Sequence, residues 1–284
     1  MNIESCKPKA ENAQEKQEKE LFHQTAVYIN AGGRGTRLEP IMPKGEKGIT
    51  KALIDFDNEP IIQKHVDLLS KLEFGKIIVG AGDHLNIEKY FKNKKTNNLI
   101  VANTEKQEDT GGDLIKAVRQ IENCGENILV ESVDTILYVK NLSQLLTQHE
   151  QTKATATIVL TTKKGVPNEN AFFVEKDGRV VYTKEVQDES NTKEPESWTG
   201  FRGSSTGVVI FKTDFLKNHP WQSGQGMLSI YRDLIPELIS RGELYAYDNE
   251  NNLFVDTGTP DKYQQVKRRK REIFKALGKK YLNQ

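Results

Sequence analysis

The pattern of apolar and polar positions changes near residue 25. Residues 1–24 are rich in Lys, Glu and Gln and show no apolar periodicity, which predicts a flexible, solvated tail or a frayed helix. Further along, compact apolar runs such as 25–31 and 76–82 predict buried strands. The segment 60–74, with apolar residues three and four apart, predicts a helix between them. This alternation predicts an α/β fold with a Rossmann-like, mixed and mostly parallel sheet flanked by helices.

The second half of the chain is less regular but carries the same kinds of signal. Residues 171–185 predict a hairpin that turns at Asp177-Gly178, and residues 204–212 predict a strand. One helix is expected to end at Gly242, and a closing helix is expected to begin near Pro260. No internal repeat or low-complexity linker separates the two halves, so we expect residues 25–284 to form one domain.

Composition and charge restrict the class of protein. The 284 residues include 36% hydrophobic and 29% charged residues, which suits a globular chain with a sizeable core. The net charge of +1 provides no global field for nucleic acid or a membrane surface. The two cysteines suit a reducing compartment, and the chain shows neither a secretory signal nor an apolar stretch of spanning length. We therefore expect a cytoplasmic protein that binds neither nucleic acid nor a membrane.

The strand predicted over 25–31 ends in a glycine-rich loop that also carries two arginines. Its residues are Ala31, Gly32, Gly33, Arg34, Gly35, Thr36 and Arg37. Backbone N–H groups in such a loop can converge on an anion, and glycine lets a phosphate approach the backbone closely. Arg37 would add countercharge. The Walker pattern is absent, and Leu38 stands where a dinucleotide fingerprint needs its third glycine. The loop therefore predicts another kind of phosphate site, with a plain turn as the alternative.

This loop resembles the signature loop of the sugar-nucleotide pyrophosphorylases, the sugar-1-phosphate nucleotidyltransferases. In that family a lysine follows before a strand, and Lys51 matches it, with Lys44 in the longer spacer as the alternative. Residues 108–118 and 128–137 resemble two central family segments, and residues 256–263 (DTGTPDKY) resemble its closing motif. The resemblance covers residues 25–268 and implies a GT-A-like nucleotidyltransferase fold. It further implies a nucleotide-binding part (25–140), a sugar-phosphate-binding part (141–260) and a C-terminal helix (260–278).

The resemblance also implies a reaction and a role for each matching residue. The reaction transfers a nucleoside monophosphate from an NTP to a sugar 1-phosphate, gives an NDP-sugar and pyrophosphate, and depends on Mg²⁺. Arg37 and Lys51 would neutralise phosphate charge, and Asp134 and Asp256 would bind the metal. Nucleotide contacts would come from Ala31, Gly32, Gly33, Gly35, Thr36, Thr110 and Gly112, and substrate contacts from Lys184, Glu185 and Gly207. Because both aspartates end predicted strands, we expect them to meet at one edge of the parallel sheet.

Two other interpretations stay open. One is a cytidylyltransferase that acts on a phosphorylated alcohol such as phosphocholine. The other is a non-catalytic, sugar-nucleotide-binding regulatory protein. The departures from the family pattern at Thr50, Val133 and Lys184-Glu185 would fit it. The sequence retains Arg37, Lys51, Asp134 and Asp256, which argues against a site that has lost its catalytic function. The sequence leaves the base, the sugar and the choice between monomer and homo-oligomer undetermined.

Overall fold

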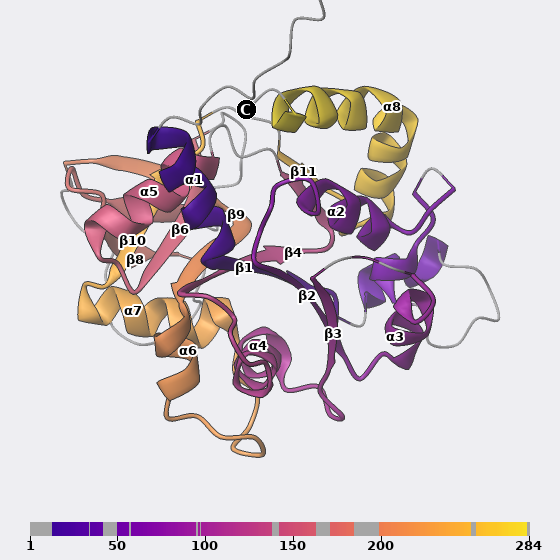
Figure 1. Ribbon diagram of the computed structural model, residues 1–284, viewed down its shortest axis with the longest axis horizontal. Coiled ribbons are helices and arrows are strands. Elements are labelled where there is room, and N and C mark those ends of the chain that lie inside the picture. The colour runs from indigo at the N-terminus through magenta and orange to yellow at the C-terminus, as the bar shows by residue number, and fades with distance from the viewer. Residues whose placement is uncertain are drawn as a thin grey trace, which may run out of the picture.

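The computed structural model describes residues 13–33, 35–41, 50–56, 58–94, 96, 98–137, 142–162, 171–184, 199–250 and 254–282. Within these residues, nine strands form one central sheet with helices on both faces (Figure 1). The strands are β1 (Thr25–Asn30), β2 (Lys76–Gly82), β3 (Leu99–Asn103), β4 (Asn127–Ser132), β6 (Ala156–Thr161), β7 (Ala171–Val174), β8 (Val180–Thr183), β9 (Phe201–Lys212) and β10 (Leu244–Asp248).

Eight α-helices of the described part surround this sheet, together with short helical turns. They are α1 (Ala13–His23), α2 (Ile61–Leu69), α3 (Leu85–Phe91), α4 (Asp109–Gln120), α5 (Leu142–Thr152), α6 (Thr213–Asn218), α7 (Ile235–Arg241) and α8 (Pro260–Leu282). The turns are two 3₁₀ helices, η1 (Thr36–Ile41) and η2 (Lys51–Leu53), and a π-helix, η4 (Ile230–Leu234).

The sheet joins the two halves of the chain through β9. Its order is β10-β6-β9-β4-β1-β2-β3, and β7 with β8 extends it beside β9. β1 pairs in parallel with β2 and β4, and β2 and β6 have parallel partners in β3 and β10. β9 runs antiparallel to β4, β6 and β7. The predicted mixed sheet flanked by helices is confirmed, and the turn of the predicted hairpin lies between β7 and β8.

The side chains of β1 pack alternately into two separate apolar layers, so this strand has almost no exposed position. Val27 and Ile29 belong to the layer covered by α2 and α8, whereas Ala26 and Tyr28 belong to the layer covered by α4 (Figure 1). A parallel strand buried on both faces reads as a continuous apolar run. The short run before the glycine loop therefore marks the centre of the fold.

The described part of the N-terminal segment begins with a helix. Residues 13–23 form α1, which lies beside α5 (Figure 1). The ring of Phe22 in its last turn meets Phe74 edge to face at 5.1 Å between centroids, and Thr25 donates its hydroxyl to the Leu21 carbonyl at 2.7 Å. The predicted tail of residues 1–24 thus contains a helix held by its two apolar C-terminal residues. Residues 1–12 lie outside the described residues.

A small second sheet carries one of the two predicted metal-binding residues. β11 (Phe254–Asp256) pairs antiparallel with β5 (Thr135–Leu137), so that Asp256 stands opposite Thr135. The expectation that Asp256 ends a strand of the parallel sheet is therefore wrong. α8 follows directly and buries Tyr263, Val266 and Ile273. Among the described residues, no helix has both the length and the apolar character to cross a membrane.

Candidate active site at the carboxyl edge of the sheet

The glycine loop leaves β1 at the carboxyl edge of the sheet and is held against β2. The N–H of Ala31 donates to the carbonyl of Gly80 at 2.9 Å. A Cβ on Gly32 would lie 2.9 Å from the backbone nitrogen of Gly82, which is closer than real side chains approach. Gly35 has a φ of 65°. Close packing thus requires glycine at position 32, and the backbone conformation favours glycine at position 35. Arg34 lies outside the described residues.

Lys51 reaches the loop from a short helix that the residue before it caps. The Thr50 hydroxyl accepts a hydrogen bond from the N–H of Ala52 at 2.9 Å and so caps η2. Thr50 stands where the family usually has proline, and its hydroxyl has a structural role here as the cap of η2. A Cβ on Gly33 would lie 3.3 Å from Cε of Lys51, so the lysine stem runs along the glycine loop. Lys44, the alternative to Lys51, lies outside the described residues.

Asp134 follows β4 and forms a nearly buried ion pair with Lys51. Nζ of Lys51 lies 2.8 Å from Oδ2 of Asp134, and the two side chains are 15% and 12% exposed. The hydroxyl of Ser132 donates to the other carboxylate oxygen at 2.5 Å. Burial by itself would raise the pKa of Asp134, but the charge and hydrogen bond of Lys51, the Ser132 hydroxyl and the charge of Arg37 together lower it. Asp134 is therefore ionised at neutral pH.

The second aspartate is brought to the first by the turn that precedes α8. Both the N–H and the hydroxyl of Thr257 donate to the backbone carbonyl of Asp134, each at 2.8 Å. The N–H of Gly258 donates to Oδ1 of Asp256 at 2.6 Å. Lys262, in the first turn of α8, places its Nζ 2.5 Å from Oδ2 of the same carboxylate. Asp134 and Asp256 thus meet through a direct backbone contact rather than through neighbouring strands.

Three charged groups converge on one point beside Gly258. A Cβ at this residue would lie 2.9 Å from Oδ1 of Asp256, 3.2 Å from Oδ2 of Asp134 and 3.3 Å from Nη2 of Arg37. No room is left there for a side chain. Four of the charged residues singled out from the sequence, including Lys51, are therefore gathered in one place.

The donor atoms at this point suit a hard divalent cation. Both carboxylates offer oxygen, and within the part of the chain that the structure describes no cluster of three or more His, Cys, Asp or Glu could hold a metal. Mg²⁺ is usually held by one or two carboxylates together with substrate phosphates. Two converging carboxylates next to cationic side chains fit that pattern.

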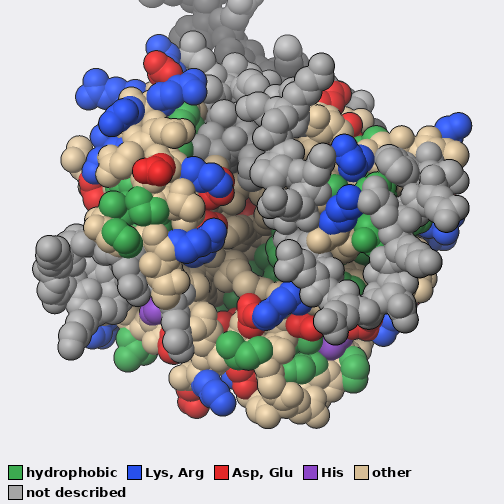
Figure 2. Space-filling model, turned by 180° about the vertical axis from the view of Figure 1, so that it is seen from behind, with side chains coloured by type: hydrophobic (Ala, Val, Ile, Leu, Met, Phe, Trp, Pro, Cys, Tyr) green, Lys and Arg blue, Asp and Glu red, His purple; other side chains and the backbone are tan. Residues whose placement is uncertain are grey.

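A cavity of about 430 Å³ opens beside the converging charges. Its charged lining is Arg37, Lys51, Glu131, Asp134, Asp256 and Lys262, and its hydroxyl lining is Thr110, Ser132, Thr135, Ser204, Ser205, Thr206 and Tyr231. The space-filling view in Figure 2 shows a face hollowed near its centre, with acidic and basic side chains around the hollow. The cavity thus offers both charged and hydroxyl-bearing groups.

Residues 27–272 match the model of the family described as "Nucleotidyl transferase". The chain belongs to this family. The match covers the glycine loop, both aspartates and most of α8. The resemblance that the sequence motifs carry is thereby confirmed at the level of the family.

Relatives of this nucleotidyl transferase chain include two mannose-1-phosphate guanyltransferases. Mannose-1-phosphate guanyltransferase beta-A of Xenopus laevis is 27% identical over 239 residues, which cover 82% of this chain and 61% of the relative. Mannose-1-phosphate guanyltransferase of Yarrowia lipolytica is also 27% identical, over 247 residues that cover 82% of this chain and 60% of the relative. The chain thus spans about three-fifths of the length of these relatives.

Solved structures share the fold of this nucleotidyl transferase chain at lower identity. HddC from Yersinia pseudotuberculosis has a TM-score of 0.62 and 19% identity, with 86% of this chain and 98% of that chain covered. The inositol-1-phosphate CTP transferase from T. maritima has a TM-score of 0.65 and 15% identity, with 87% of this chain and 95% of that chain covered. These likenesses confirm the expected nucleotidyltransferase fold.

The remaining predicted site residues do not all lie in the cavity. Thr110 and Gly207, whose φ is 82°, line it. Gly112 is buried elsewhere, and a Cβ there would lie 3.0 Å from the ring of Trp221. Lys184 is not part of the lining and has its Nζ 5.8 Å from the centre of the Phe173 ring. Glu185, its proposed companion, lies outside the described residues.

Lys262, Tyr231 and Ser205 are among the lining residues that were not singled out from the sequence. A lysine in the first turn of a helix is electrostatically unfavourable, because that end of the helix dipole attracts negative charge. The position of Lys262 directly after the closing motif was therefore a usable signal. Tyr231 and Ser205 carry no local signal of this kind, since they belong to ordinary helical and strand patterns.

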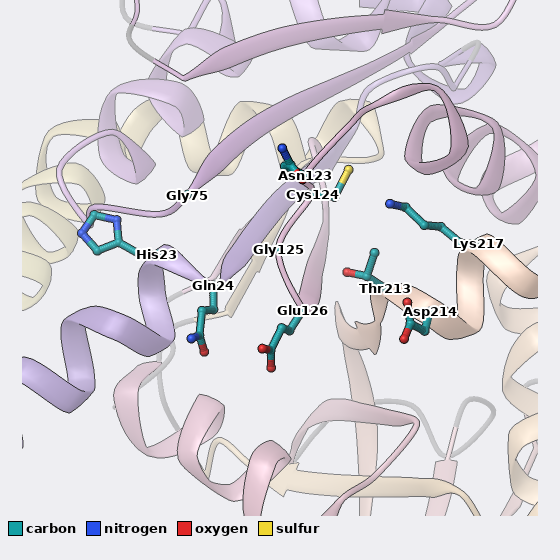
Figure 3. Close-up of a pocket in the computed structure, with 10 residues that line it drawn as sticks. All are labelled: His23, Gln24, Gly75, Asn123, Cys124, Gly125, Glu126, Thr213, Asp214 and Lys217. Atoms are coloured by element: carbon teal, nitrogen blue, oxygen red, sulfur yellow. The ribbon is translucent and has the colours of Figure 1, made fainter.

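A second cavity, of about 420 Å³, lies at the opposite, amino edge of the sheet (Figure 3). His23 and Gln24 precede β1 there, and Gly75 precedes β2. Cys124, drawn in Figure 3, is buried, and this burial raises the pKa of its thiol. None of the predicted site residues lines this cavity, so the candidate chemistry is concentrated at the carboxyl edge.

Proposed function

We propose that this chain transfers a nucleoside monophosphate from an NTP to a sugar 1-phosphate and releases pyrophosphate. The observation that carries the proposal is the convergence of Arg37, Asp134 and Asp256 beside Gly258, with Lys51 bound to Asp134. A site for two phosphate-bearing reactants needs cations for the phosphates and carboxylates for a divalent metal. This arrangement offers both within one cavity.

The proposed reaction needs positioning and countercharge more than a covalent nucleophile. An oxygen of the sugar phosphate attacks the α-phosphorus of the NTP, and the bond from that phosphorus to the oxygen bridging the β-phosphate breaks. Pyrophosphate leaves with the electron pair of that bond. Both reactants are anions, so the approach is opposed by charge repulsion. Arg37, Lys51 and Lys262 would offset this repulsion and hold the phosphates in line.

The backbone of the glycine loop would hold the nucleotide. We propose contacts from Ala31, Thr36 and the glycines between them, since exposed N–H groups bind phosphate without a side chain in the way. Asp134 and Asp256 would hold Mg²⁺, which would supply further neutralisation of phosphate charge when bound. In that state Lys51 and Lys262 would be freed from their carboxylate partners for the phosphates.

The sugar would lie against the hydroxyl groups that line the cavity. Ser and Thr hydroxyls both donate and accept hydrogen bonds, which suits a polyhydroxylated ring. We propose Gly207 as a contact on this side, and we retain Lys184 and Glu185 as proposed ligands from the family resemblance. GTP with mannose 1-phosphate is the first pair to test, because two relatives are mannose-1-phosphate guanyltransferases.

The test is pyrophosphate release over a panel of NTPs and sugar 1-phosphates, with Mg²⁺, for the wild type and Asp256→Asn. We expect Asp256→Asn to lower kcat/KM by about 100-fold or more, because metal-ion stabilisation contributes several kcal/mol to such reactions. Asp261→Asn removes an equivalent charge at an exposed position in the first turn of α8, and it should keep kcat/KM within about twofold of the wild type.

The same assay separates the three interpretations when phosphocholine is added to the panel and the binding of sugar nucleotides is measured beside it. Turnover with CTP and phosphocholine, but with no sugar phosphate, would favour the cytidylyltransferase. Binding of sugar nucleotides without pyrophosphate release from any pair would favour the regulatory protein. Full Mg²⁺-dependent turnover by Asp256→Asn would remove Asp256 from the metal site.

A further inference from the structure

Two segments far apart in the chain are tied together beside the cavity. Residues 108–112 begin α4, and residues 228–232 lead into the π-helix η4. The N–H groups of Gly111 and Gly112 donate to the carbonyl of Leu228 at 2.8 and 3.0 Å. The hydroxyl of Thr110 accepts from the N–H of Ile230 at 3.0 Å. The side chain of Thr110 is thus engaged with the backbone of the neighbouring segment.

The tie is close enough to constrain both backbones. A Cβ on Gly111 would lie 3.0 Å from the carbonyl oxygen of Leu228. Asp109 has a φ of 67°, in the left-handed region that is unfavourable for a non-glycine residue. Its carboxylate accepts from the N–H of Thr110 at 2.6 Å and forms an ion pair with Arg232. The strained conformation is therefore held by contacts on both sides.

Tyr231 stands between two residues that are tied in this way. Ile230 is bound through its backbone to Thr110, and Arg232 is paired with Asp109. π-Helical turns occur frequently at functional sites. Because its neighbours on both sides are anchored, Tyr231 has little freedom to leave the cavity that it lines.

The phenol of Tyr231 reaches across the cavity wall to β9. Its oxygen lies 2.9 Å from Oγ of Ser205, which also accepts from the N–H of Gly207 at 3.1 Å. Both hydroxyls belong to the cavity lining. A hydroxyl has one donor and two acceptor positions, so each of these two groups can serve more than one partner. Such a pair suits a ligand hydroxyl that can donate as well as accept.

We propose that Tyr231, with Ser205, is a specificity-determining residue that recognises a ring hydroxyl of the sugar phosphate. We further propose that Thr110 is a positioning residue for Tyr231, acting through Ile230, rather than a direct contact to the nucleotide. The proposal rests on the proposed function for the identity of the ligand. A site built to hydrogen-bond a ligand hydroxyl discriminates strongly against ligands that lack it, because its own polar groups are then left unpaired.

The test compares Tyr231→Phe, Thr110→Val and Thr110→Ser with the wild type. Hexose 1-phosphates (mannose, glucose and galactose) are titrated calorimetrically, and KM for sugar phosphate and NTP is measured separately. We expect Tyr231→Phe to weaken binding of the best hexose 1-phosphate by roughly three- to tenfold, with the NTP KM unchanged, since one hydrogen bond is lost. Thr110→Val should act in the same direction, and Thr110→Ser, which keeps the hydroxyl, should restore binding.

Tyr182→Phe is the matched control, because it removes a phenol oxygen from β8, outside the cavity lining. An unchanged hexose-phosphate affinity in Tyr231→Phe, or an equal rise of the NTP KM, overturns the proposal. Failure of all three hexose 1-phosphates to bind the wild type also overturns it. If the wild type turns over and Tyr231→Phe does not change that turnover, the inference fails and the proposed function stands. Binding without turnover, weakened by Tyr231→Phe, supports the inference while the proposed function fails.

Discussion

Replacing Lys51 by Met removes the cation that neutralises Asp134 while keeping a long apolar side chain in its place. The carboxylate left behind is only 12% exposed. It would retain the hydrogen bond from Ser132 at 2.5 Å and the favourable charge of Arg37. The substitution therefore leaves one nearly buried charge without its strongest partner, and it should lower the stability of the folded chain.

The magnitude follows from how far this ion pair is removed from water. Exposed ion pairs contribute about 0–1 kcal/mol, whereas breaking a fully buried pair costs about 3–5 kcal/mol. Side-chain exposures of 15% and 12% lie close to the buried limit, but Ser132 still satisfies one carboxylate oxygen. We expect a loss of about 2 kcal/mol at pH 7, or roughly 4–6 °C in Tm for a chain of this size.

The effect should also depend on pH. The pKa of Asp134 is lowered in the folded chain, so its contribution to stability is present above the unfolded pKa of about 4. That contribution is lost as the pH falls through the folded pKa. Because Lys51 causes much of the lowering, the difference between wild type and Lys51→Met should be largest at neutral pH. It should shrink as the pH falls below about 4.

Urea unfolding at pH 7 and at several pH values down to 3 measures both effects. Lys262→Met is the matched control, because Lys262 also pairs with a site carboxylate but the two side chains are 53% and 30% exposed. It should cost no more than about 0.5 kcal/mol. Equal losses for the two variants, or a Lys51→Met loss that stays constant from pH 7 to pH 3, would refute the reasoning.

Two further predictions concern the glycine loop and a buried histidine. Gly32→Ala should cost about 1–3 kcal/mol in thermal unfolding and weaken NTP binding, because its Cβ would meet the backbone nitrogen of Gly82 at 2.9 Å; wild-type stability would contradict this. Burial lowers the pKa of His149 to about 4. As the pH falls, His149 is therefore protonated near pH 6.5 in the unfolded chain but stays neutral in the folded chain down to about pH 4. The stability of the folded chain should fall between pH 6.5 and 4. His149→Gln should flatten that part of the pH–stability curve, and an unaltered slope would count against it.

The sequence by itself determined the features that depend on neighbouring residues. The apolar run before the glycine loop predicted β1, because a strand buried on both faces leaves no polar positions. The αL conformation at Gly242, whose φ is 68°, ends α7 as the sequence predicted. The loop motif also carried enough information to indicate a phosphate site and the family. These signals are local, since backbone conformation and burial are encoded over a few residues.

The tertiary structure decided which chemical groups meet. Asp256 reaches Asp134 through β11 and the Thr257 backbone rather than through the parallel sheet. The hydroxyl of Thr110 binds the backbone of Ile230, which is 120 residues away in the chain. Contacts of this kind depend on how whole elements pack, and packing a strand or helix differently leaves its local pattern unchanged. No local pattern could therefore specify them, and the composition of the site follows from the packing of the complete fold.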